Sequence, residues 1–276
     1  MSKSSSSKSK QKQIARVLII AGSDSGGGAG IQGDIKTVTC LGGYGATAIT
    51  ALTAQNTLGV FDIHDVPESF IAKQIKLVLD DIGADAIKTG MLNKESVIEI
   101  VADSISTYSH IPLILDPVMF AKGGASLLPA SALSALKTLL IPQATIITPN
   151  VPEAEYLSDI TIKTVGDMRR AAEKILALGC KAVMLKGGHL HGDIVTDLLL
   201  TPDGESIFEQ PRIVTKHTHG TGCTLASAIA TSIAQKMSII DAIIRARKYV
   251  LVAIETAPNI GNGHGPLNHG HTIMHN

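Results

Sequence analysis

The chain has 276 residues, of which 24 are basic and 24 acidic, so its formal net charge at pH 7 is zero. Without a net charge there is no long-range field to hold nucleic acid or an anionic membrane surface, and we expect neither as a partner. Hydrophobic residues make up 45% of the chain, which is enough for a full core. No apolar run approaches the ~20 residues that span a bilayer.

The two ends of the chain have the composition of tails. Residues 1–13 are mostly Ser, Lys and Gln and have almost nothing to bury, so we exclude them from the fold. The stretch 261–276 carries four histidines that could chelate a metal, but we favour a mobile tail without fixed ligand geometry. No linker divides the residues between the ends, so we predict one domain over 14–270 and a short C-terminal tail over 271–276.

Between the tails, short apolar runs alternate with segments of helical period. The apolar runs predict strands at 16–21, 46–51, 84–89, 112–116, 145–148 and 182–186. Apolar residues at spacings of three and four predict helices at 33–40, 68–79, 95–105, 131–139 and 165–178. After Gly192, the segments IVTDLLL and SIFEQ around the turn TPDGE predict an antiparallel hairpin at one edge. The alternation is typical of an α/β protein with a mostly parallel central sheet and helices on both faces.

Two glycine-rich loops carry the chemistry. The first, GSDSGGGAG at 22–30, joins a strand to a helix and lacks both the Walker A pattern and a clean dinucleotide fingerprint, so it could also be only a tight turn. The second, THGTGCT at 218–224, directly precedes a helical stripe. Its backbone N–H groups at Gly220, Thr221 and Gly222 then lie at a helix N-terminus, which favours phosphate or a developing anion. We call residues 218–224 the anion loop.

The three cysteines have different expected roles. Cys223 falls in the first turn of the helix after the anion loop, an environment that lowers the pKa of a thiol towards neutrality, so we consider it a candidate catalytic base. Cys40 and Cys180 lie in or beside apolar helices and are expected to act as small buried hydrophobes. An odd number of cysteines without a secretory segment predicts a reducing compartment, the cytoplasm.

Seven motifs together are more specific than any one of them. In chain order they are AGSDSGGGAGIQGDIKT at 21–37, TALTAQNT at 50–57, KTGML at 88–92, LDPVM at 115–119, TPNVPEAEYL at 148–157, LKGGH at 185–189 and THGTGCTLASAIA at 218–230. This set resembles the hydroxymethylpyrimidine/phosphomethylpyrimidine kinases of the ribokinase superfamily, which close the anion loop with Gly-Thr-Gly-Cys. The resemblance implies a three-layer ribokinase-like fold, ATP as the phosphoryl donor, and a pyrimidine and its monophosphate as acceptors. His217 stands where that family usually has Asn.

The resemblance also implies a set of residues around the pyrimidine ring. Asp34 and Gln55 are expected to face the ring, and the pocket around it is expected to be shaped by Gly22, Ala29, Met91 and Val118. The amide of a glutamine offers a donor and an acceptor on one face, which an aminopyrimidine edge needs. Without the motif, Gln55 could equally be a loop amide that bonds to its own backbone.

Acidic and basic residues at strand ends are the candidates for Mg²⁺ and ATP. Asp116 and Glu153 are the expected metal ligands, because Mg²⁺ takes oxygen ligands and keeps several waters. Glu153 could instead only cap a helix, since Asn150-x-x-Glu153 also resembles a capping box. Lys186 is expected to reach a phosphate, with a snorkelling surface lysine as the alternative. The expected ATP contacts are Asn150, Lys186, Thr218 and His219.

Three other functions remain open from the sequence. A pyridoxal or pyridoxine kinase would use a similar flat acceptor with a hydroxymethyl arm, and one enzyme could serve both. A hydrolase with Cys223 as nucleophile and His219 as base lacks an evident orienting residue. A sensor that kept the fold without turnover is also conceivable, since fold alone does not prove chemistry. We expect the kinase, as a homodimer.

Overall fold

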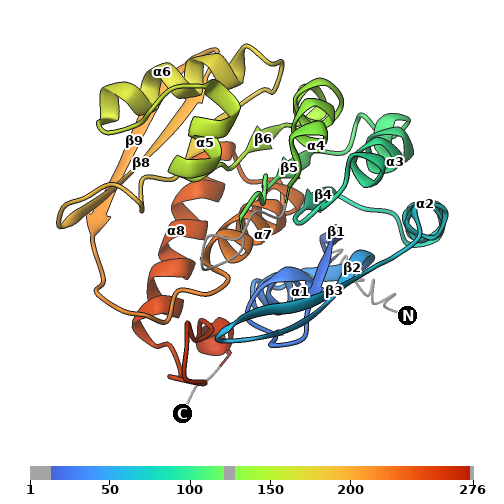
Figure 1. Ribbon diagram of the computed structural model, residues 1–276, viewed down its shortest axis with the longest axis horizontal. Coiled ribbons are helices and arrows are strands. Elements are labelled where there is room, and N and C mark those ends of the chain that lie inside the picture. The colour runs from blue at the N-terminus through green and yellow to red at the C-terminus, as the bar shows by residue number, and fades with distance from the viewer. Residues whose placement is uncertain (1–13, 121–127, 274–276) are drawn as a thin grey trace, which may run out of the picture.

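The computed structural model describes residues 14–120 and 128–273 (Figure 1). Within these ranges a sheet of nine strands has the order β3-β2-β1-β4-β5-β6-β7-β8-β9. Its strands are β1 Arg16–Asp24, β2 Tyr44–Asn56, β3 Gly59–Asp65, β4 Ala86–Thr89, β5 Leu113–Leu115, β6 Ile146–Ile147, β7 Val183–Leu185, β8 Ile194–Thr201 and β9 Gly204–Pro211. The strands from β2 to β7 in this order pair in parallel. Strand β3 pairs antiparallel with β2, strand β8 with β7, and strand β9 with β8. The predicted mostly parallel sheet and the hairpin at its edge are confirmed.

Helices cover both faces of the sheet, as expected. They are α1 Gly30–Cys40, α2 Glu68–Leu77, α3 Glu95–Ser106, α4 Ala130–Ala135, α5 Val151–Ser158, α6 Val165–Leu176, α7 Thr221–Ala234 and α8 Ile239–Glu255. Successive side chains of a strand point to opposite faces, so Val17 and Ile19 of β1 pack with α1, α7 and α8, whereas Leu18 and Ile20 pack with the remaining helices (Figure 1). The result is the three-layer arrangement of the predicted fold.

The sequence analysis assigned no element to β3, α5 or α8. Strand β3 lies at the edge of the sheet, where its alternating residues are at best half-buried and give a weak pattern. Helix α5 begins at a capping box in which the Asn150 side chain accepts from the Glu153 N–H at 3.0 Å and Glu153 accepts from the Asn150 N–H at 2.8 Å. The helix-cap interpretation of Glu153 is therefore confirmed, which leaves its role towards a metal open.

The C-terminal segment is packed, and the prediction of a mobile tail over 261–276 is wrong for the residues up to 273. The His264 N–H donates to the carbonyl of Thr57 at 2.8 Å, and the Tyr249 hydroxyl donates to the carbonyl of His269 at 2.6 Å. His269 itself is only 5% exposed. The sequence of the segment shows no helical or strand period, because contacts with distant parts of the chain hold it in place and no long regular element is needed. We call residues 259–273 the C-terminal strap.

Two findings apply to the described residues only. Among residues 14–120 and 128–273, no three His, Cys, Asp or Glu side chains are grouped so that they could hold a metal ion; His275 lies outside this part of the chain. No helix in the described ranges is sufficiently long and apolar to cross a bilayer.

Candidate active site

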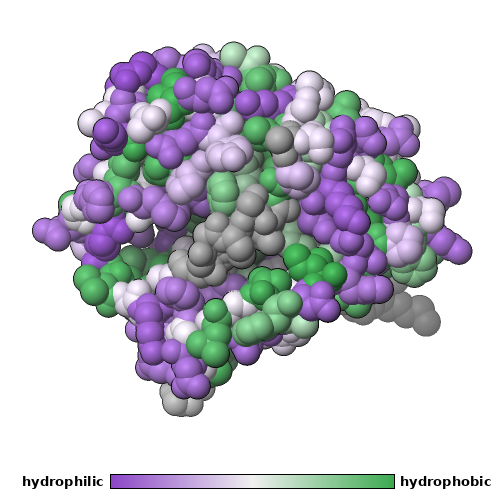
Figure 2. Space-filling model, viewed as in Figure 1, coloured by the Kyte–Doolittle hydropathy of each residue, from purple (hydrophilic) through white to green (hydrophobic). Residues whose placement is uncertain are grey.

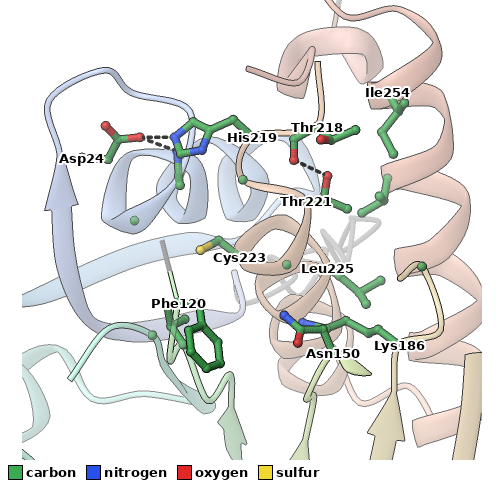
Figure 3. A pocket seen from close by; sticks show the side chains of 18 of the residues that line it. Asp24, Phe120, Asn150, Lys186, Thr218, His219, Thr221, Cys223, Leu225 and Ile254 are labelled. Atoms are coloured by element: carbon green, nitrogen blue, oxygen red, sulfur yellow. Dashed lines mark hydrogen bonds and ion pairs between the residues drawn. The ribbon is translucent and has the colours of Figure 1, made fainter. Parts of the chain in front are cut away.

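A cavity of about 840 Å³ lies beyond the carboxyl ends of the parallel strands, where open α/β sheets bind their ligands. Helix α7 begins beside it, and the first glycine loop forms the opposite side (Figure 3). Most of the predicted site residues line this cavity: Gly22, Ala29, Gln55, Met91, Val118, Asn150, Lys186, Thr218, His219, Gly220, Thr221, Gly222 and Cys223. Asp34, Asp116 and Glu153 are buried behind its wall, with exposed fractions of 0%, 2% and 4%.

The anion loop runs directly into helix α7, which begins at Thr221. Gly220 has a φ of 85°, and a Cβ on it would lie 1.9 Å from the carbonyl oxygen of Gly28, so only glycine fits between the two loops. The Thr221 hydroxyl donates to the carbonyl of Thr218 at 2.7 Å and holds the loop closed (Figure 3). A Cβ on Gly222 would lie 3.2 Å from the Lys186 ammonium, so the missing side chain leaves room for a group between that cation and the helix N-terminus.

Cys223 lies in the first turn of α7 and faces the cavity between the two loops (Figure 3). The expectation that its position lowers the pKa of the thiol is wrong. Loss of solvent around the half-buried side chain raises the pKa of Cys223 to about 12, although the nearby charge of Lys88 and a hydrogen bond from Gly30 oppose this rise. The thiol is therefore protonated at neutral pH in the ligand-free protein.

Beneath Cys223 lies a buried ion pair that the sequence analysis missed. The ammonium of Lys88 on β4 bonds to both carboxylate oxygens of Asp34 on α1, at 2.8 and 2.9 Å, and neither side chain is exposed. Ser227, one turn after Cys223 on α7, donates to the same carboxylate at 2.6 Å. Burial disfavours the charge of Lys88, but Asp34 outweighs this and raises the pKa of the ammonium. Asp34, expected to face the pyrimidine, instead has Lys88 between its carboxylate and the cavity floor.

A second cation lies on the other side of Cys223. Lys186 follows β7, and its ammonium is 3.3 Å from Oδ1 of Asp116, an oxygen to which Thr148 also donates at 3.2 Å. The side chain of Lys186 is 14% exposed and borders the cavity. Burial opposes its charge, but Asp116 and Glu153 outweigh this and raise the pKa of Lys186.

Asp116 and Glu153 fit a cation that is held mainly by phosphate and water. Both bonds to Asp116 go to Oδ1, and its Oδ2 would lie 3.8 Å from a Cβ on Gly222. Glu153 uses Oε2 in the cap of α5, and burial raises its pKa to about 7 although Lys186 opposes this. Two oxygen-bearing side chains next to an anion site are what Mg²⁺ needs when it keeps most of its waters.

At the opposite end of the anion loop, His219 is held between two loops. Its Nε2 lies 2.8 Å from Oδ2 of Asp24 and 3.3 Å from the amide nitrogen of Gln55 (Figure 3). The backbone of His219 is fixed from behind by the C-terminal strap, because its N–H donates to the carbonyl of Gly265 at 3.2 Å. The ring of His219, expected to bind ATP, thus points towards the first glycine loop and away from Thr218.

Several further residues of the cavity carried no motif. Leu225 of α7 and Val250 and Ile254 of α8 form an apolar side of the cavity. Next to it, Arg247 donates to Asp197 at 2.9 Å, and both side chains are about one-tenth exposed. The sequence signal for this side was the helical spacing of Arg247, Val250 and Ile254, which also fits an ordinary core helix.

The comparisons with known proteins cover almost the whole chain. Residues 24–268 match the family model described as phosphomethylpyrimidine kinase. A hydroxymethylpyrimidine/phosphomethylpyrimidine kinase from Bacillus subtilis is 51% identical over 93% of this chain and 95% of that protein, and one from Escherichia coli is 43% identical over 92% and 97%. A thiamine biosynthesis bifunctional protein from Geobacter sulfurreducens is 51% identical over 92% of this chain, which spans 52% of that longer protein.

The solved structures that are similar carry two names. A phosphomethylpyrimidine kinase from Clostridium difficile superposes with a TM-score of 0.78 at 42% identity, over 87% of this chain and 99% of that one. The ADP complex of a pyridoxal kinase from Bacillus subtilis superposes with a TM-score of 0.89 at 36% identity, over 95% of this chain and 100% of that one. The two kinds of kinase thus share this fold. The matching family model and the relatives of higher sequence identity are named as pyrimidine kinases. The chain belongs to the phosphomethylpyrimidine kinase family.

Proposed function

We propose that this protein is a kinase of thiamine biosynthesis that transfers the γ-phosphoryl group of ATP twice. The first acceptor is the hydroxymethyl oxygen of 4-amino-5-hydroxymethyl-2-methylpyrimidine. The second acceptor is the monophosphate so formed, which becomes the diphosphate. The observation that carries the proposal is the cavity in which Gln55, Cys223, Lys186 and the anion loop lie together.

In the first transfer, the oxygen of the alcohol bonds to the γ-phosphorus while the bond from that phosphorus to the bridging oxygen of ADP breaks. The base that takes the proton of the alcohol is the ionised form of Cys223, which is a minor fraction at neutral pH, and the thiol so formed later releases the proton to water. The N–H groups of Gly220 and Gly222 stabilise the charge on the moving phosphoryl group, whereas the N–H of Thr221 donates within the loop to the carbonyl of Thr218 at 3.3 Å. Lys186 offsets the charge that develops on ADP. The second acceptor is already an anion and needs little help from a base.

The nucleotide and the metal are assigned to the side of the cavity nearest Lys186. Asn150 and Thr218 join Lys186 there as candidates for contacts with ATP. Asp116 and Glu153 would hold Mg²⁺ from behind the same wall, where the ion would neutralise phosphate charge. On the acceptor side, Gln55 would bond to the edge of the pyrimidine between Gly22, Ala29, Met91 and Val118.

We also propose a domain organisation, a compartment and an oligomeric state for the protein. We assign residues 14–270 to one kinase domain that works in the cytoplasm, in keeping with three free thiols. A homodimer is supported by the edge strand β3 and its neighbouring turn, where Leu58 and Phe61 are 66% and 69% exposed. Figure 2 shows hydrophobic side chains along this margin of the molecule.

The second candidate is a pyridoxal kinase, which the close superposition on a protein of that name favours. Both kinases would use the same anion loop and cavity, so the acceptor alone separates them. Turnover of hydroxymethylpyrimidine and of pyridoxal, each measured as ADP release, decides between single and dual use.

The thiol provides the sharpest test of the two-step mechanism. The Cys223→Ala variant should lose about 10² to 10⁴ in the rate of the first transfer and far less in the second, because only the alcohol must lose a proton. Since the pKa of the thiol is about 12, its ionised fraction rises about tenfold per pH unit, and the first rate should rise with it from pH 7 to 9. Each rate is measured with one acceptor supplied alone.

The matched control is Cys180→Ala, because Cys180 is also a free thiol but is buried away from the cavity. This variant should keep both rates and the pH dependence of the first. Small and equal losses in both transfers for Cys223→Ala, with the pH dependence unchanged, would remove the thiol from the mechanism.

A further inference from the structure

Gln55 lies between two side chains whose donors and acceptors decide how its amide is oriented. The amide nitrogen is placed 3.3 Å from Nε2 of His219, and the amide oxygen is placed 3.2 Å from the hydroxyl of Thr53. The oxygen and nitrogen of an amide have nearly the same shape, so their positions follow from the hydrogen-bond network. The hydrogen bonds around Gln55 are consistent with only one orientation of its amide.

Asp24 determines which nitrogen of the His219 ring carries a proton. Its Oδ1 accepts from the N–H of Gly26 at 2.8 Å, and its Oδ2 accepts from the N–H groups of Gly28 and Ala29 at 3.1 and 2.8 Å. Burial opposes the charge, but the bonds from His219 and the backbone outweigh it and lower the pKa of Asp24. Asp24 is therefore an acceptor, and the Nε2 of His219, at 2.8 Å, must carry a proton and donate to it.

A ring nitrogen that carries a proton has no lone pair to accept another hydrogen. If the NH₂ group of Gln55 faced Nε2 of His219, two donors would oppose each other at 3.3 Å. The oxygen of the amide, by contrast, can share the Nε2–H with Asp24. His219 thus favours the orientation in which the Gln55 oxygen faces the imidazole.

Thr53 leads independently to the same orientation. Its hydroxyl lies 2.9 Å from the carbonyl oxygen of Ser23, which can only accept, so the single hydroxyl proton is used there. Towards Gln55 the hydroxyl offers lone pairs, which need the NH₂ group as their partner. Both neighbours of Gln55 therefore favour the amide turned over from this placement, with its oxygen at the His219 side and its nitrogen at the Thr53 side.

We infer that His219, held by Asp24, is a positioning residue that fixes the orientation of the Gln55 amide and thereby the selectivity for an aminopyrimidine acceptor. This inference rests on the proposed function for Gln55. The fixed amide shows the cavity an acceptor on the His219 side and a donor on the Thr53 side. An aminopyrimidine edge has an amino donor beside a ring-nitrogen acceptor, so its amino group can donate to the Gln55 oxygen while its ring nitrogen accepts from the Gln55 nitrogen. Pyridoxal has no amino group beside its ring nitrogen, so it cannot form both hydrogen bonds and binds less favourably.

The glycine loop is shaped around this arrangement. A Cβ on Gly28 would lie 2.5 Å from Cδ2 of His219, so the glycine lets the loop pack directly against the ring. The C-terminal strap holds the backbone of His219 through Gly265. His219 is thus fixed from both sides, as a residue that orients another must be.

The tautomer of His219 is tested directly by ¹⁵N NMR of the imidazole in the full-length protein without ligands. We expect a protonated Nε2 at pH 7.5. An unprotonated Nε2, with the proton on Nδ1 alone, would overturn the inference whatever the enzyme phosphorylates. The readout needs no substrate, so it separates this inference from the assignment of the acceptor.

Selectivity is tested by a double-mutant cycle with His219→Phe and Gln55→Ala. His219→Phe should lower the ratio of kcat/KM for hydroxymethylpyrimidine to that for pyridoxal by about 10- to 100-fold, with the KM for ATP nearly unchanged. His219→Gln, which can return an N–H to the same place, should recover part of the ratio. In the Gln55→Ala background, His219→Phe should leave the ratio unchanged. An equal fall in both backgrounds, or a rise in the KM for ATP with the ratio intact, would overturn the inference.

Discussion

Lys88 and Lys186 are two lysines at the ends of buried parallel strands, and each is paired with an aspartate near Cys223. Lys88 is fully buried, and both oxygens of Asp34 lie within 2.9 Å of its ammonium. Lys186 keeps 14% of its side chain exposed, and Asp116 is 3.3 Å away. Because Lys88 is fully buried, we expect it to keep Asp34 as its partner, whereas we expect the partly exposed Lys186 to exchange part of its bond to Asp116 for a bond to a phosphate. On this proposal, distance and exposure separate a lysine that supports the site from one that binds the ligand.

The largest effect is expected from breaking the tighter pair. Lys88→Met leaves the carboxylate of Asp34 buried without its cation, so the free energy of unfolding should fall by about 3 to 5 kcal/mol. Urea denaturation measures it. The double variant Lys88→Met with Asp34→Asn should recover much of the loss, because no unpaired charge then remains. Lys76→Met is the matched control, since the side chain of Lys76 is 73% exposed. If Lys88→Met and Lys76→Met had equal small effects, the pair would not stabilise the fold.

Lys186→Met should give the complementary result. We expect kcat to fall by about 10² to 10³, because the charge that offsets the negative charge developing on ADP is lost. The free energy of unfolding should fall less than for Lys88→Met, since Lys186 is partly exposed and bonds to its partner at 3.3 Å. Lys186→Arg keeps the charge and should restore part of kcat. A variant that loses stability as strongly as Lys88→Met but keeps kcat would erase the distinction.

The smallest effect is expected from a pair outside the site. Arg16 at the start of β1 bonds to both carboxylate oxygens of Asp85, at 3.0 and 3.1 Å, but the two side chains are 30% and 23% exposed. Arg16→Met should lower the free energy of unfolding by about 1 kcal/mol or less. Because Arg16 lies at the end of β1 opposite to the cavity, both phosphoryl transfers should keep their rates. A clear loss of kcat in this variant would show that ion pairs far from the cavity also affect the rate of phosphoryl transfer.

The same two lysines show what the sequence could predict of the site. Lys186 was found because it ends an apolar run and is followed by two glycines, a pattern that places a charge at the crevice. Lys88 lies within an apolar run, and its partner Asp34 is 54 residues earlier in the chain. A pattern read along one segment cannot pair residues that only the fold brings together.

Burial explains the other differences between prediction and structure. The buried parallel strands and the helices on both faces followed from apolar runs and helical spacing, because a core leaves that signal in every segment it buries. The pKa of Cys223 could not be predicted, since the helix N-terminus is local but the loss of solvent around the thiol depends on the walls of the cavity. The strap was missed because its backbone, more than its side chains, makes the contacts with Thr57 and His219.

That strap makes completion of the acceptor end of the cavity a late event in the synthesis of the chain. The carbonyl of Gly265 holds His219, and the N–H of His264 holds the turn at Thr57, yet both strap residues follow strands β1 to β9 in the sequence. On the ribosome, the sheet from β1 to β9 can therefore form while these residues are still inside the exit tunnel. A nascent chain that stalls between β9 and the strap has the core of the fold but an incomplete acceptor end.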